Sequence, residues 1–180
     1  MLVTNLFGAP GAGKSTGAAF LFSQLKLAGI NAELVTEYAK DKVWEEDRAV
    51  FDNQVYIFGK QSFRISRLVG KVDVAITDSP ILLSDYYNHN DRWGKEFSAL
   101  AQKLFEDYDN LNFFVERSKP YNPAGRFQNE KESDDVGDSM RDYLEANHIP
   151  YTTISGDEKG YMQAFYLILN HLHEKDVSHV

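Results

Sequence analysis

The run Gly8-Ala9-Pro10-Gly11-Ala12-Gly13-Lys14-Ser15 constrains this chain more than any other part of its sequence. It directly follows an apolar segment, residues 2–7, and precedes a segment with apolar residues at helical spacing. The pattern G-x-x-x-x-G-K-S is typical of a loop that wraps phosphate groups. Its glycines let backbone N–H groups point inward, and the following helix adds its positive end. We therefore expect a strand, a phosphate-binding loop and a helix in this order.

Two side chains of the loop have specific expected tasks. Lys14 is expected to reach the β- and γ-phosphates of a nucleotide, and Ser15 is expected to bind Mg²⁺. The predicted nucleotide-binding residues are Gly8, Ala9, Pro10, Gly11, Ala12, Gly13, Lys14, Ser15 and Thr16. The motif thus predicts a nucleotide and Mg²⁺ as bound groups.

Composition narrows the class of protein. With 180 residues, 43% of them hydrophobic, the chain is expected to form one domain, residues 1–180. It has no cysteine, no apolar stretch of membrane-spanning length and no signal-peptide pattern, so a cytoplasmic protein without a membrane partner is expected. The net charge of −8 offers no broad basic surface, which disfavours DNA binding without excluding it. Composition leaves the oligomeric state open.

Beyond the loop, strand-like and helix-like segments alternate. Strands are expected at 2–7, 32–36, 72–77, 111–115 and 151–154, and helices at 16–27, 51–69, 97–107, 133–147 and 161–173. The second helix is expected to bury the face that carries Phe51, Val55, Phe58, Ser62, Ile65 and Val69. This order predicts a three-layer α/β/α fold with a five-stranded parallel sheet and right-handed crossovers.

Ligands of such sheets collect at the carboxyl ends of the strands, where polar residues follow in this chain. Asp78 comes directly after a buried strand, as expected of a Mg²⁺-organising carboxylate. Glu37, after the second strand, is a candidate to bind the acceptor hydroxyl or act as its base, with Tyr38 beside it. The alternatives are a turn aspartate before proline and a solvated glutamate. Ser79 stands where ATPases often have a second acid, which favours transfer over hydrolysis.

A long segment, residues 117–135, is expected to form a lid loop between a strand and a helix. Arg117 and Arg126 are its candidates for stabilising the transferred phosphoryl group, and a solvated charged loop is the alternative. Tyr86-Tyr87 and Tyr121 are expected in loops near the rim, where they could stack on a ring.

Three side chains of the second helix are candidates to contact the acceptor. Gln54 and Gln61 share a face and could read the edge of a base, and Arg64 could hold an acceptor phosphate. Ordinary surface roles are the alternatives.

Four segments together make the chain similar to a known group. They are the loop 8–16, Thr36-Glu37-Tyr38, Ile76-Thr77-Asp78-Ser79-Pro80 and the arginine-bearing loop 117–128. With these motifs the chain resembles the small P-loop kinases, a group that includes nucleoside, nucleotide and ribosylnicotinamide kinases, and especially the compact members often encoded by bacteriophages. The resemblance implies a P-loop NTPase fold and, for a phage protein, the host cytoplasm.

The resemblance also implies roles for residues. The counterpart of Asp78 organises Mg²⁺ or activates the acceptor, those of Arg117 and Arg126 contact phosphates, and the turn Gly156-Asp157 touches adenine. Ser79 departs from thymidylate-type kinases, which place an arginine there.

The predicted function is a Mg²⁺- and ATP-dependent kinase that transfers the γ-phosphoryl group to a hydroxyl or phosphate of a nucleoside-like or nucleotide-like small molecule. One alternative is a phage-type kinase acting on a hydroxymethylated pyrimidine within DNA. Others are an acceptor-independent ATPase or a non-catalytic nucleotide-binding regulatory module. A GTPase is disfavoured because Asn129-Glu130-Lys131-Glu132 does not match the Asn-Lys-x-Asp element of guanine recognition.

Overall fold

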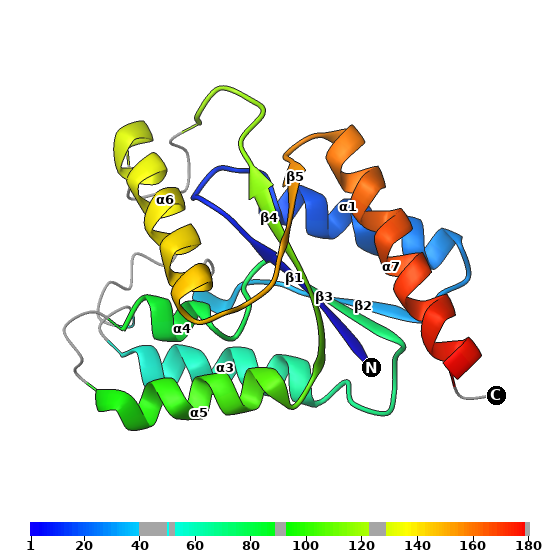
Figure 1. Ribbon diagram of the computed structural model, residues 1–180, viewed down its shortest axis with the longest axis horizontal. Coiled ribbons are helices and arrows are strands. Elements are labelled where there is room, and N and C mark those ends of the chain that lie inside the picture. The colour runs from blue at the N-terminus through cyan, green and yellow to red at the C-terminus, as the bar shows by residue number, and fades with distance from the viewer. Residues whose placement is uncertain (40–49, 51–52, 89–92, 123–128, 179–180) are drawn as a thin grey trace.

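The computed structural model describes residues 1–39, 50, 53–88, 93–122 and 129–178. Its centre is a parallel sheet with the strand order β2-β3-β1-β4-β5 (Figure 1). The strands are β1 (Leu2–Phe7), β2 (Ala32–Val35), β3 (Val74–Thr77), β4 (Asp109–Glu116) and β5 (Thr152–Ser155). The predicted α/β fold with a five-stranded parallel sheet is confirmed. Because β1 is central, the phosphate-binding loop leaves from the middle of the sheet.

Helices cover both faces of the sheet (Figure 1). One face carries α1 (Lys14–Leu27) and α7 (Glu158–Ser178), which share a core with the sheet. The other carries α3 (Gln54–Ser66), α4 (Leu83–Tyr86), α5 (Gly94–Glu106) and α6 (Glu130–Ala146). Among the described residues, no helix is long and apolar enough to cross a membrane.

Two segments expected to be loops are partly helical. Helix α6 begins at Glu130, inside the expected lid 117–135, because Asn129 and Glu132 form a capping box: Glu132 N donates to Asn129 Oδ1 (2.9 Å), and Asn129 N donates to Glu132 Oε2 (2.8 Å). The connection from β4 to α6 is therefore 117–129, and Arg126 lies outside the described residues. Tyr86 ends the short helix α4 and does not lie in a loop.

Helix α3 buries a face that only partly matches the expected one. Phe58 and Ile65 are buried as expected, together with Ile57 and Gln61, whereas Val55 and Val69, the latter beyond the end of the helix, are 41% and 55% exposed. Phe51 lies outside the described residues. The spacing of apolar residues did not predict the whole buried face, because a polar residue, Gln61, is part of it.

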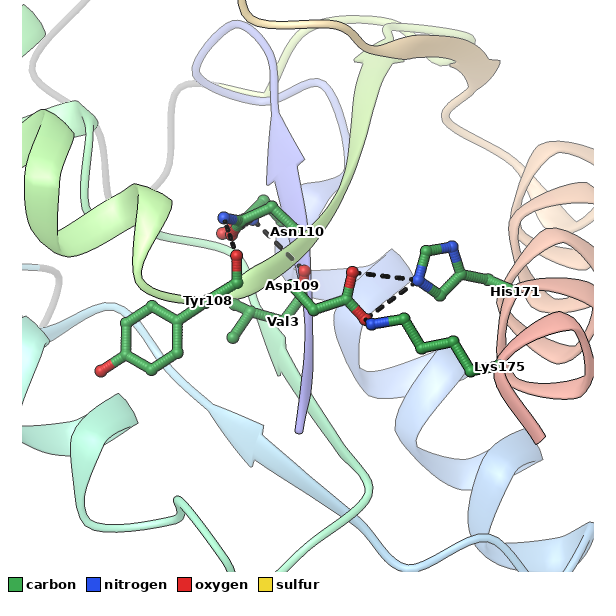
Figure 2. A network of polar contacts seen from close by, with 7 residues as sticks. Val3, Tyr108, Asp109, Asn110, His171 and Lys175 are labelled. Carbon is green, nitrogen blue, oxygen red and sulfur yellow. Dashed lines mark hydrogen bonds and ion pairs between the residues drawn. The ribbon is translucent and has the colours of Figure 1, made fainter. Parts of the chain in front are cut away.

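A charged cluster joins β4 to α7 at the amino-terminal edge of the sheet, away from the phosphate-binding loop (Figure 2). The Asp109 carboxylate forms hydrogen bonds with His171 Nε2, at 3.0 and 3.1 Å, and with Lys175 Nζ, at 2.5 Å. Burial opposes ionisation of Asp109, but hydrogen bonds and charge from Lys175 and His171 outweigh it and lower the pKa of this carboxyl. The cluster anchors the carboxyl-terminal half of α7 to the sheet.

We expect Asp109→Asn to lower the free energy of unfolding by about 1 kcal/mol at neutral pH, since the ion pairs are partly buried. The folded-state pKa lies below the unfolded value of about 3.9, so the contribution of Asp109 is complete above that pH and is lost as the pH falls through the folded-state pKa. Urea unfolding of the wild-type protein and of Asp109→Asn at pH 7 and near pH 3.5 measures the loss of stability and its dependence on pH. Asp107→Asn, an exposed neighbour, is the control. A stability difference that stays constant between the two pH values would contradict the assignment.

Candidate nucleotide and phosphoryl-transfer site

The loop between β1 and α1 has the backbone that its glycines predict. Gly8, Gly11 and Gly13 have φ angles of 137°, 82° and 105°, in the region that favours glycine. Lys14 Nζ donates to the carbonyl oxygens of Gly8 (2.6 Å) and Ala9 (3.0 Å). The loop backbone therefore folds around the Lys14 side chain, and the Lys14 ammonium group lies against the carbonyl groups of the loop.

Helix α6 supports this loop from one side. The buried Ser133 Oγ donates to Pro10 O (2.6 Å), and Gly8 N donates to Met140 Sδ (3.4 Å). Gly137 lies against Ala9, where an added Cβ would come within 3.2 Å of the alanine Cβ. Sequence reasoning missed these contacts. The spacing of Ser133, Gly137 and Met140 on one helical face was the available signal.

Tyr161 supports the loop from the α7 side. Its hydroxyl donates to Gly13 O (2.9 Å), and its ring packs where a Cβ on Gly17 would approach ring carbon Cε1 at 2.7 Å. Burial, with a smaller contribution from Asp157, raises the pKa of Tyr161, so the phenol stays protonated and able to donate. This supporting residue was also missed, because its partner lies 148 positions away.

The turn after β5 reaches the same loop. Gly156 N donates to Glu116 O (2.7 Å), and Gly156 packs directly against the backbone of Ala12. Asp157 accepts from Gly160 N (3.0 Å) and Ser155 Oγ (2.7 Å), and these bonds lower the pKa of its carboxyl. The turn is therefore held beside the phosphate-binding loop, and contact of Gly156 and Asp157 with adenine stays a prediction.

The two predicted acids lie together at the ends of β2 and β3. Glu37 N donates to Asp78 Oδ1 (3.0 Å), and Asp78 is only 3% exposed. Burial, with smaller contributions from Tyr86 and from the charge of Glu37, raises the pKa of Tyr87. The Tyr87 phenol therefore remains neutral within the electrostatic reach of Glu37.

The candidate acceptor residues on α3 and the neighbouring Tyr38 differ in their surroundings. Gln61 is 2% exposed and bonds the protein at both ends of its amide, which corrects the expectation that it faces a base. Arg64 donates to Thr36 O (2.9 Å) and lies 5.2 Å from the centre of the Tyr38 ring, so it buttresses the turn after β2. Tyr38 shares a hydroxyl hydrogen bond with Tyr56 (2.9 Å). Gln54 is half-buried in the first turn of α3.

Arg117 follows β4 and is tied to α6. Its guanidinium pairs with Glu130 (3.1 Å) and Asp134, and it lies over the Tyr121 ring at 5.2 Å. Arg117, Glu130 and Asp134 border a cleft of about 480 Å³ that reaches Ala9 of the phosphate-binding loop. The structure thus places Arg117 beside the loop but partly neutralised by two carboxylates.

The residues present fit a nucleotide with Mg²⁺. The positive-φ glycines and the Lys14 ammonium give this loop the backbone form and the cation that phosphate binding requires. Ser15 is exposed on the first turn of α1, and Asp78 directly follows β3, the strand next to β1. A hydroxyl and a carboxylate are hard oxygen ligands of the kind that Mg²⁺ takes.

Comparison with known proteins supports this picture. A family model described as an AAA domain matches residues 3–159. Among solved structures, a deoxyadenosine kinase from M. mycoides with bound dATP matches with a TM-score of 0.59 at 17% sequence identity. That match covers 96% of this chain and 100% of the other. At this identity the likeness concerns the fold. No curated protein matches the sequence.

Proposed function

The chain belongs to the AAA-domain family and has a nucleoside-kinase-like P-loop fold, and from this premise we propose that it is a Mg²⁺- and ATP-dependent kinase. The transferred group is the γ-phosphoryl group, and the acceptor is a hydroxyl or phosphate of a nucleoside or nucleotide. One observation carries the proposal: the backbone N–H of Glu37 donates to the Asp78 carboxylate, which brings these two acidic residues together at the end of the sheet from which the phosphate-binding loop also leaves. Parallel sheets bind and convert their ligands at this end.

The chain's own residues supply positioning and charge. The loop amides and Lys14 would hold the phosphates of ATP, and Ser15 and Asp78 would hold Mg²⁺. Glu37 would hydrogen-bond the acceptor hydroxyl and accept its proton. Arg117 and Arg126 would complete the site by stabilising negative charge on the transferred group. Bound Mg²⁺ neutralises phosphate charge and orients the donor.

The acceptor is the feature that an assay must identify. The solved structure of similar fold is a deoxyadenosine kinase, so deoxyadenosine is the first acceptor to test. We expect γ-labelled ATP to label a nucleoside or nucleotide faster than it releases free phosphate. The panel contains deoxyadenosine, the other nucleosides, their monophosphates, hydroxymethylated DNA and a sample without acceptor.

Each other outcome contradicts the proposal in a different way. Phosphate release at an equal rate without acceptor would indicate an ATPase. Label in DNA alone would show that the acceptor is DNA and not a free nucleoside or nucleotide. Nucleotide binding without turnover would indicate a regulatory module.

A further inference from the structure

Two consecutive backbone amides after β2 are held by two different elements. Glu37 N donates to Asp78 Oδ1 (3.0 Å), at the end of β3. Tyr38 N donates to Gln61 Oε1 (3.1 Å), on α3. The backbone on both sides of the Glu37 side chain is therefore fixed by side chains from outside its own strand.

The other end of the Gln61 amide reaches β3. Nε2 donates to Thr77 Oγ1 (3.2 Å), and the same hydroxyl oxygen accepts from Ser79 N (3.0 Å). Gln61 and Thr77 are 2% and 0% exposed, so water does not compete for these bonds. Rotating the amide by half a turn would place donor against donor at Tyr38, so the amide is locked in one orientation.

This bridge begins where the sheet ends. The pairing of β2 with β3 stops at Val35 and Thr77, whereas the two acids follow those residues by two positions and by one. Gln61 spans the gap, since it bonds the residue after Glu37 and the residue before Asp78. The hydrogen bonds that pair β2 with β3 end before Glu37 and Asp78, so they alone cannot hold the turn that carries Glu37.

We infer that Gln61 is a positioning residue for phosphoryl transfer: it fixes the backbone that carries Glu37 against the end of β3 that carries Asp78. The inference rests on the proposed function for the role of Glu37. Gln61 acts only through the placement of Glu37 and does not touch the acceptor. Phosphoryl transfer depends on placement, and a shift of about 1 Å can cost about 100-fold in rate.

The test is a double-mutant cycle on kcat with Gln61→Met and Glu37→Gln. Methionine keeps the approximate length of the side chain, removes the donor to Thr77 and replaces the amide oxygen with a weakly accepting sulfur. With γ-labelled ATP and the acceptor of highest turnover in the panel, Gln61→Met should lower kcat about 10- to 100-fold with little change in the KM for ATP. In the Glu37→Gln background the same substitution should lower kcat less than about 3-fold, because no base remains to be placed. An equal loss in both backgrounds, or no loss, would overturn the inference.

Two further variants separate positioning from general structural damage. Thr77→Val removes the hydroxyl that Gln61 meets and should reproduce the loss if Gln61→Met does not fold. Gln102→Met removes a comparable amide bond, from Nε2 to Asn147 Oδ1 (2.7 Å), on α5 and should leave kcat unchanged. A fully active, folded Thr77→Val protein, or a loss in Gln102→Met equal to that in Gln61→Met, would contradict the bridge.

Hydrogen exchange gives a readout independent of turnover. The Tyr38 amide should be protected in the wild-type protein and exchange at least about 10-fold faster in Gln61→Met, but not in Gln102→Met. If the wild-type protein labels no acceptor, the proposed function fails while this measurement still reports on the bridge. If the protein is an active kinase and Tyr38 exchange is unchanged in Gln61→Met, only the inference about Gln61 fails.

Discussion

Replacing Lys14 with alanine is expected to slow phosphoryl transfer about 1000-fold while the protein stays folded. Lys14 contributes the ammonium inside the phosphate-binding loop, where negative charge would gather during transfer. In the structure this ammonium contacts two backbone carbonyls of the loop, those of Gly8 and Ala9. Lys14 is only half-buried, so water can replace the lost donor and little stability is lost.

The rate is measured with γ-labelled ATP, and folding is checked by thermal unfolding. Lys26→Ala provides the control, because Lys26 is an exposed residue in the last turn of the same helix and lies away from the loop. Transfer at the wild-type rate by folded Lys14→Ala protein would exclude the loop as the donor site.

Local signals were enough to predict the sheet and the position of the loop. The glycine pattern of residues 8–15 acts through the backbone of those same residues, and the alternation of apolar segments requires no long-range knowledge. The polar residues expected at the strand ends also come together, as with Glu37 and Asp78, because parallel strands end at one edge. Even the early start of α6 has a local signal, since Asn129 and Glu132 have the spacing of a capping box.

Contacts between distant segments were not predictable in this way. Ser133 and Pro10 lie 123 positions apart, and Tyr161 and Gly13 lie 148 apart. Gln61 shows the same limit in another form. As a glutamine on an amphipathic helix it gave the pattern of a surface residue, and only the placement of the Tyr38 amide and the Thr77 hydroxyl explains its burial. Polar partners that satisfy a buried amide leave no periodic pattern in a sequence.

Gly156→Ala is expected to destabilise the protein by about 1–3 kcal/mol and to weaken ATP binding. An alanine Cβ would collide with the carbonyl oxygen of Ala12 and would lie 2.7 Å from that of Glu116. Both are backbone atoms, so no side-chain rotation can relieve the contact. The turn after β5 must then move away from the phosphate-binding loop, which stretches the bond from Gly156 N to Glu116 O (2.7 Å) and removes support from Ala12.

Gly59→Ala makes the same chemical change in an open position and should have the opposite sign. Nothing lies within 4 Å of a Cβ built on Gly59, which is an exposed residue inside α3. Alanine should stabilise the protein there by about 0.5–1 kcal/mol, because it loses less backbone entropy on folding. Urea unfolding compares the two variants, and calorimetry with ATP and Mg²⁺ tests whether only Gly156→Ala binds more weakly. If Gly156→Ala matched the wild-type protein in both measurements, the turn after β5 would not support the nucleotide-binding loop, and contact of Gly156 and Asp157 with the nucleotide would lose its structural basis.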